Sequence, residues 1–146
     1  MLEMSDKFPP VNEEQVVAFE RELGRPLPPQ YRQFLLLYNG GRPQKDTFVV
    51  SGADDEDIVD FFYGIGINNI YDLLENREIY ESRIPEELLP IAGDPGDNQI
   101  CISLTSDNYG KMYFWDHELE FTPDQAITPL ADSFDEFIGS LRDYEE

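Results

Sequence analysis

Two helical patterns joined by a short proline-rich corner are the feature that most constrains how this chain can fold. Asn12 suits a helix N-cap, and Gln15 supplies the partner of a capping box. Apolar residues at helical spacing then predict a first helix over Asn12–Leu23, which Gly24 ends. Three prolines within residues 25–29 stop that helix, and a second is predicted over Pro29–Tyr38. Because so few residues connect the two helices, we expect an antiparallel or crossed pair.

Each predicted helix carries an apolar stripe. Phe19 lies on the stripe of the first helix and Phe34 on that of the second, so both rings are expected to be buried. The segment Asn39–Gly41 ends the second helix, because Asn and Gly tolerate the left-handed backbone found at helix ends. We therefore expect both stripes to face a sheet together.

The rest of the chain alternates short apolar runs with turn residues, a pattern typical of strands joined by loops. Strands are predicted over residues 47–51, 58–67, 88–92, 99–104 and 111–115, and helices over residues 70–83 and from a capping box at Ser133–Glu136. The segment Asp94–Asp97 predicts a type II turn, since proline stands second and glycine third. This order of elements, over 146 residues, predicts a single α+β domain.

The composition places limits on the compartment. Cys101 is the single cysteine, so the chain can form no internal disulfide, which suits a reducing compartment. Residues 1–10 lack the pattern of a signal peptide, and no apolar run reaches the ~18 residues that span a membrane. We therefore expect a cytoplasmic protein.

The net charge of −21 is spread very unevenly along the chain. Residues 1–48 carry 6 basic and 7 acidic residues, whereas residues 49–146 carry 4 basic and 24 acidic residues. Such a field disfavours nucleic acid and anionic membranes as partners and favours a basic partner. The simpler interpretation, that the charge only maintains solubility, remains open.

Motifs for catalysis or metal binding are weak. His117 is the single histidine, so with Cys101 it falls short of a zinc ligand set, and no nucleophile motif accompanies it. Neither acidic segment, 54–57 or 94–97, has EF-hand spacing, and Gly64–Asn69 lacks the third glycine of a dinucleotide fingerprint. With 31 acidic residues, a nearby pair of carboxylates carries no specificity for glycoside hydrolysis. We predict no enzyme activity, no metal and no cofactor.

Two separated signatures carry a resemblance to a known family. The first runs over Leu23–Gly41, and the second over Ile91–Ile100, followed by Gly110–Glu118. In this order they resemble the SUKH superfamily, which holds bacterial immunity proteins of toxin systems and fungal regulators of cell-wall glucan synthesis. The resemblance covers about residues 11–141. It implies a mainly antiparallel curved sheet packed by the N-terminal helix pair, a middle helix and a C-terminal helix.

The resemblance also implies a function without catalysis: binding and neutralising a protein toxin. Because the family binds diverse toxins, it does not identify the partner. Together with the acidic charge after residue 48, it leads us to expect a basic nuclease domain. The family's recurrent turn and Trp strand look structural, or else border the partner site: Gly93, Asp94, Gly96, Asp97 and Trp115. The segment first expected to contact a partner is the acidic run in which charge density peaks, Asp54, Asp55, Glu56 and Asp57. A solvated loop is the simpler interpretation of this run.

Two other classes stay open. A regulatory scaffold linked to cell-wall synthesis would form stable complexes with housekeeping proteins and show no linkage to a toxin. A carboxylate-dependent enzyme would show a carboxyl group with a strongly raised pKa in a closed pocket.

Overall fold

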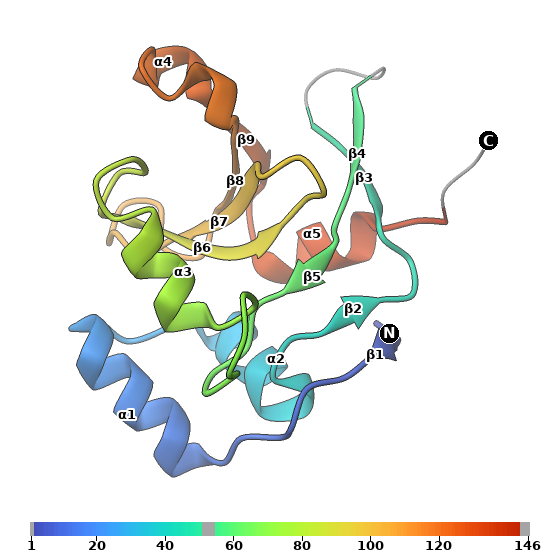
Figure 1. Ribbon diagram of the computed structural model, residues 1–146, viewed down its shortest axis with the longest axis vertical. Helices are drawn as coiled ribbons and strands as arrows, with labels where there is room; N and C mark the ends of the chain where they lie inside the picture. The colour runs from blue at the N-terminus through green and yellow to red at the C-terminus, as the bar shows by residue number, and fades with distance from the viewer. Residues whose placement is uncertain (1, 51–54, 144–146) are drawn as a thin grey trace.

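The computed structural model describes residues 2–50 and 55–143 of the chain, and its elements are labelled in Figure 1. The α-helices are α1 (Glu13–Leu23), α2 (Pro29–Tyr38), α3 (Leu73–Ile79), α4 (Pro123–Ala126) and α5 (Phe134–Ser140), and a 3₁₀ turn, η1, covers His117–Leu119. The strands are β1 (Met4–Asp6), β2 (Arg42–Pro43), β3 (Thr47–Val49), β4 (Glu56–Ile58), β5 (Phe61–Phe62), β6 (Leu88–Gly93), β7 (Gln99–Ser103), β8 (Met112–Trp115) and β9 (Ile127–Ala131).

A five-stranded antiparallel sheet, in the order β5-β6-β7-β8-β9, forms the centre of the molecule. Side chains alternate between its faces: Ile100 and Ile102 of β7 join the main core, while Cys101 joins a smaller cluster with Trp115 on the other face. The strand predicted over residues 99–104 is present as β7. Both faces are covered, so every residue of β7 is buried.

The helices cover this sheet in the predicted arrangement. The pair α1 and α2 pack on each other, α2 packs on α5, α5 packs on β9, and α3 packs on β6 (Figure 1). Phe19 is 4% exposed and Phe34 is 5% exposed, so both predicted core positions are confirmed. The α+β single-domain fold is confirmed with them.

Local hydrogen bonds explain why the helix pair could be predicted from the sequence. The capping box of α1 is present, since Gln15 N donates to Asn12 Oδ1 at 2.9 Å and Asn12 N donates to Gln15 Oε1 at 2.9 Å. Gly24 ends α1 with a left-handed φ of 79°. The corner is then held by Glu20, whose carboxylate accepts from Leu27 N at 2.7 Å and from Arg32 Nε at 3.3 Å.

The prediction of a strand over residues 58–67 is wrong, because the polypeptide leaves one strand partner for another within this segment. Residues 56–58 pair with β3 in a separate two-stranded sheet, whereas Phe61 and Phe62 pair with β6 of the central sheet. Between them, Val59 N donates to Asp46 O and Asp60 N donates to Gly93 O, both at 2.8 Å.

Two further expectations need correction, and one strand was not predicted. The helix predicted over residues 70–83 begins only at Leu73, after the cap Asp72, and ends at Ile79. The turn over Asp94–Asp97 is not type II, because the residue with positive φ is Asp97 at 70° rather than Gly96. Strand β9 was not predicted; it lies at the edge of the sheet, where Pro129 is tolerated because it removes no interior hydrogen bond.

Candidate functional site

The acidic run predicted to contact a partner lies in and beside the β3–β4 hairpin. Asp54 lies outside the described residues. Asp55 and Glu56 are exposed, and Glu56 forms an ion pair with Arg142. Asp57 is half-buried in β4, and its Oδ2 is enclosed. From Glu56 on, the run is therefore a strand and not the expected loop, and its contact with a partner stays a prediction.

The turn between β6 and β7 is organised around the carboxylate of Asp94. This residue is 8% exposed. Its Oδ1 accepts from the backbone N–H groups of Gly96 and Asn98, both at 2.8 Å, and its Oδ2 accepts from Asn98 Nδ2 at 2.8 Å. Asp97 is exposed on the same turn. Three N–H donors thus hold the Asp94 carboxylate and fix the direction of the Asn98 side chain.

Behind this turn, buried polar side chains form a chain of hydrogen bonds. The Tyr63 hydroxyl donates to Gln99 Oε1 at 2.6 Å, and Gln99 Nε2 donates to the Tyr80 hydroxyl at 3.2 Å. A Cβ at Gly93 would lie 2.7 Å from the Tyr63 hydroxyl, so only glycine leaves room for this contact. These hydrogen bonds link the end of β5, the β6–β7 turn and the end of α3, and they hold the three segments in place.

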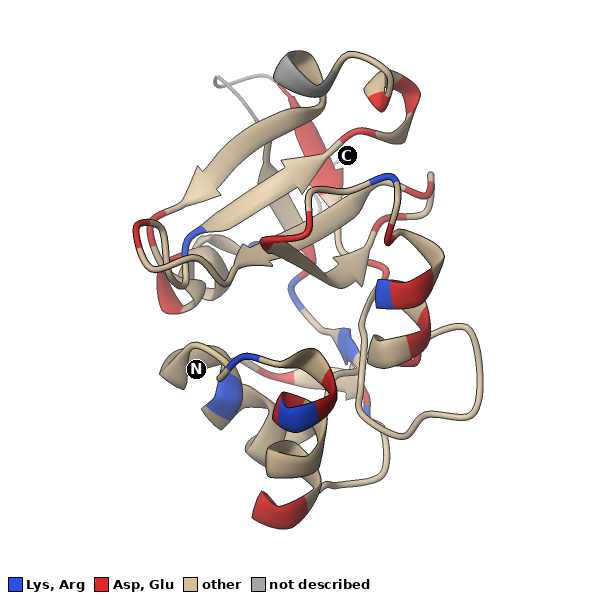
Figure 2. Ribbon diagram, turned by 90° about the vertical axis from the view of Figure 1, so that its left-hand side faces the viewer, with Lys and Arg blue, Asp and Glu red and all other residues tan. Residues whose placement is uncertain are grey.

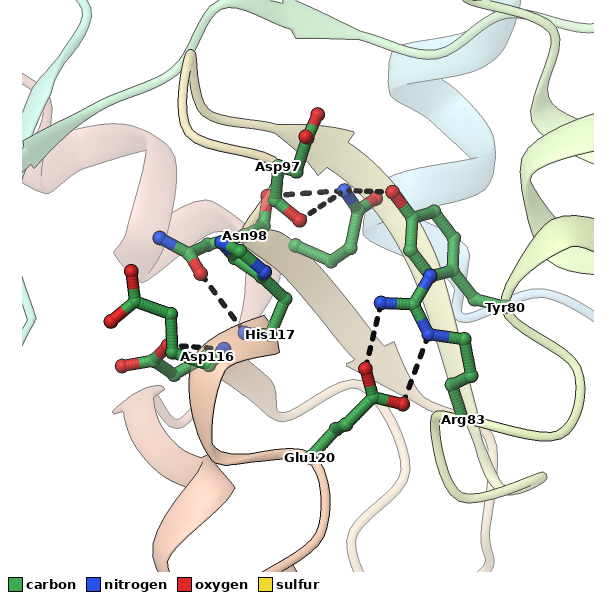
Figure 3. A network of polar contacts seen from close by, with 9 residues as sticks. Tyr80, Arg83, Asp97, Asn98, Asp116, His117 and Glu120 are labelled. Carbon is green, nitrogen blue, oxygen red and sulfur yellow. Dashed lines mark hydrogen bonds and ion pairs between the residues drawn. The ribbon is translucent and has the colours of Figure 1, made fainter.

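Arg83, just after α3, joins that helix to the segment after η1 (Figure 3). Its guanidinium donates to both carboxylate oxygens of Glu120, at 3.1 and 3.0 Å, and hydrogen bonding to Glu120 raises the pKa of Arg83. The same guanidinium lies 5.1 Å from the ring centre of Tyr80 and 5.3 Å from that of Trp115. Bidentate pairing and aromatic stacking together restrict this side chain to one position.

The η1 turn is tied to the β6–β7 turn from the other side. His117 N donates to Asn98 Oδ1 at 3.0 Å, and Glu118 N donates to Asp116 Oδ1 at 3.0 Å (Figure 3). The 3₁₀ turn therefore begins on two side-chain acceptors, one of which belongs to the β6–β7 turn.

These segments make one strongly acidic surface. Residues 72–87, 94–98 and 116–120 together carry 11 acidic residues and 2 arginines. Figure 2 shows Asp and Glu on these segments, whereas the helix pair carries both signs. We call this surface the acidic face and define it by its exposed carboxylates: Glu75, Glu78, Glu81, Glu86, Glu87, Asp97 and Glu118.

An exposed aromatic ring stands beside the acidic face. Phe121 is 91% exposed. Its backbone is held in a turn, because Thr122 N donates to Leu119 O at 2.9 Å and Gln125 N donates to Thr122 O at 2.8 Å. Ile79, on α3, is 53% exposed. A large apolar ring presented on an ordered turn is the kind of side chain that anchors protein interfaces.

Salt should stabilise the free protein. Among the described residues, ion pairs use only four arginines, against 31 acidic residues in the chain, so carboxylates repel one another in the folded state. We expect the melting temperature to rise by a few degrees between about 10 mM and about 150 mM sodium chloride, where the Debye length falls to ~8 Å. Calorimetry at constant pH measures the shift. A flat or falling melting temperature would show that cations already neutralise the acids.

The single cysteine and the single histidine of the sequence both lie among the described residues. Cys101 is fully buried, and burial raises the pKa of its thiol, which disfavours the nucleophilic thiolate. The hydrogen bond that His117 donates to Asn98 comes from its backbone N–H and not from its ring. Over the described part of the chain, no group of three or more His, Cys, Asp or Glu residues is placed to hold a metal ion.

The comparison with known proteins decides the family. The sequence pattern of the SMI1 / KNR4 family (SUKH-1) matches residues 10–140, a range that contains the helix pair, the central sheet and α5. The chain belongs to this family. The resemblance to the SUKH superfamily that the two signatures predicted is therefore confirmed.

A curated relative of this SMI1 / KNR4 family member comes from Bacillus subtilis (strain 168). It is the SPbeta prophage-derived uncharacterized protein YokK, which is 35% identical to the chain; the alignment covers 94% of this chain and 78% of the relative. Among the described residues of the present protein, no helix is long and apolar enough to cross a membrane.

The sequence predicted the acidic character of the acidic face, but it did not predict the Arg83–Glu120 pair or the exposed Phe121 beside it. Arg83 and Glu120 are 37 positions apart, and no sequence spacing links a residue just after α3 to one just after η1. Phe121 follows Glu120 without any local pattern that distinguishes an exposed ring from a core ring. The excess of acids after residue 48 was the only available signal.

Proposed function

We propose that this protein is a non-catalytic immunity protein that binds a basic toxin domain in the cytoplasm and neutralises it. The acidic face, with Phe121 beside it, is the surface that meets the toxin. A nuclease is the toxin class we favour, because a nuclease presents positive charge to phosphates and therefore complements this surface.

The observation that carries the proposal is an almost fully exposed aromatic residue, Phe121, next to the acidic face with its seven exposed carboxylates. The two features serve different parts of binding. Opposite charges accelerate association, by ~10–10³-fold in steered complexes. A buried aromatic anchor lengthens the lifetime of the complex. Membership of the SMI1 / KNR4 family and a prophage-derived relative support the same proposal.

The alternative functions explain fewer of these observations. A scaffold for cell-wall synthesis accounts for an exposed interface but gives no reason for a net charge of −21. A carboxylate-dependent enzyme requires an acid with raised pKa in a closed pocket. Burial and the neighbouring Asp94 do raise the pKa of Asp57, but two hollows among the described residues, of about 590 and 190 Å³, are lined by other residues.

A protection assay tests the proposal. A gene for a basic toxin domain is sought beside the gene for this chain, the domain found is co-expressed with the chain in a bacterial host, and growth is compared with that of cells expressing the toxin domain alone. We expect growth to recover, and an inactive toxin variant to form a 1:1 complex with the chain in size-exclusion chromatography. An acidic toxin domain from another system is the control. Unchanged toxicity without complex formation at micromolar concentrations would reject the immunity role.

A further inference from the structure

A small hollow opens at the edge of the acidic face. Its volume is about 190 Å³, far more than a single water molecule needs. Residues 81–85, which follow α3, line it together with Trp115 and Glu120 on either side of η1 and with Ala126 and Ile127 at the start of β9. The hollow thus lies where three segments of the chain meet, and it has room for one side chain of a partner.

The buried part of the lining is apolar. Ile84, Trp115 and Ala126 all line the hollow, and all three are buried. Apolar surface of this kind is stabilised by contact with methylene groups in place of water. The inner part of the hollow therefore suits an aliphatic stem.

The more exposed part of the lining carries carboxylates with unused acceptor capacity. Glu81 is exposed, and among the described residues no Lys or Arg forms an ion pair with it. Glu120 accepts two hydrogen bonds from Arg83, whereas a carboxylate offers about four acceptor sites. Both groups can therefore accept further N–H donors from a partner.

Arg83 also lines the hollow, but it does not make the hollow suitable for an anion. Its guanidinium is paired with Glu120 and lies over the rings of Tyr80 and Trp115 (Figure 3). With Glu81, the lining holds two carboxylates and one guanidinium, and the acidic face around it adds further negative charge. This field attracts a cation and repels an anion.

We propose that this hollow is a socket for one long basic side chain, an arginine or a lysine, presented by a protein partner. Such side chains join an apolar stem to a charged head, and the hollow joins an apolar interior to exposed carboxylates in the same order. Phe121 directly follows Glu120, so the socket stands beside the exposed ring. That the basic side chain belongs to the toxin rests on the proposed function.

The socket and the ring play reciprocal parts in such a complex. Phe121 is an anchor that this chain presents to the partner, whereas the hollow receives an anchor that the partner presents. Arginine is among the residues enriched in interface hot spots, and such hot spots fill pockets of the opposite surface. The socket therefore selects partners that carry a protruding basic side chain, beyond the general attraction of positive charge.

Trp115 permits a direct test, because it is the single tryptophan of the chain and lines the hollow. Its indole N–H gives one signal in heteronuclear NMR of the full-length chain. The probe is N-acetyl-arginine amide, and N-acetyl-citrulline amide, of the same length but uncharged, is its control. We expect the arginine probe to shift the Trp115 signal saturably, with a dissociation constant of roughly 1 mM or weaker. The citrulline probe should bind at least ~10-fold more weakly.

Two pairs of variants place the binding in the hollow. Ser82 is exposed and lines the hollow, so Ser82→Tyr should fill the space and abolish the shift. Ser106→Tyr, the same change at an exposed position between β7 and β8, should bind the probe like the wild type. Glu81→Gln should weaken probe binding by about 3–10-fold. Glu86→Gln, an exposed neighbour outside the lining, should leave it unchanged.

The same variants connect the socket with the toxin domain. Ser82→Tyr should weaken toxin binding by ~10-fold or more, and Ser106→Tyr should not. Equal binding of the toxin by the wild type and Ser82→Tyr would overturn the socket as part of the interface and leave the immunity role intact. A Trp115 signal that does not shift saturably, or that shifts equally with citrulline, would overturn the socket itself. Failure of the wild type to bind any toxin would instead reject the proposed function, and the probe titration would still decide whether the hollow takes a basic side chain.

Discussion

Replacing Phe34 with alanine should lower the free energy of unfolding by ~3–5 kcal/mol, the range for removing a buried aromatic ring from a core. The ring is 5% exposed. Its centre lies 5.1 Å from those of both Phe62 and Phe134 and 5.7 Å from that of Tyr38. The substitution therefore removes contacts with α2, α5 and the central sheet at once. Urea unfolding followed by circular dichroism measures the change.

Leu37→Ala on the same helix is the matched control. Leu37 is 68% exposed, so its loss removes little buried area, and we expect a change within about 0.5 kcal/mol. A loss below about 1 kcal/mol for Phe34→Ala would mean that the helix pair is not packed into the core as described.

The N-terminal helices could be predicted because the information that forms them is local. The Asn12–Gln15 capping box, Gly24 and the prolines of the corner all act within a few residues of the elements that they start or stop. The segment 58–67 could not be predicted in the same way. Its apolar residues fit a strand that Gly64 and Gly66 interrupt, and only tertiary pairing shows that the chain leaves β3 for β6 before Phe61.

The candidate site shows the same division between local and tertiary information. The excess of acids after residue 48 was visible in the sequence and predicted a basic partner. The enclosed position of the Asp57 side chain was not visible, because it depends on the pairing of β4 with β3 and on the segments packed around that hairpin. A run of four acids suggests a solvated loop, and only the fold shows that two of its members, Glu56 and Asp57, belong to a strand.

Phe121→Ala should weaken binding of the toxin domain by about 30-fold or more, the ~2 kcal/mol expected of an interface hot spot. The ring is 91% exposed in the free protein, so its removal leaves no cavity and should not change the melting temperature. The loss should appear almost entirely as faster dissociation, because a neutral ring makes its contacts after the two proteins meet. Surface plasmon resonance with the inactive toxin variant measures both rate constants.

Charge reversal on the acidic face should lower the association rate constant of the toxin complex while leaving its dissociation rate constant nearly unchanged. Glu78 and Glu118 are exposed, on α3 and η1 respectively. A Glu78→Lys, Glu118→Lys protein should associate roughly 3–10-fold more slowly at low salt and show a shallower salt dependence, with dissociation little changed. Leu37→Ala, which removes an exposed apolar side chain from α2, should alter neither rate. Equal effects of Phe121→Ala and Leu37→Ala would place the interface elsewhere while leaving the immunity role intact, since protection in the co-expression assay does not depend on which surface is used.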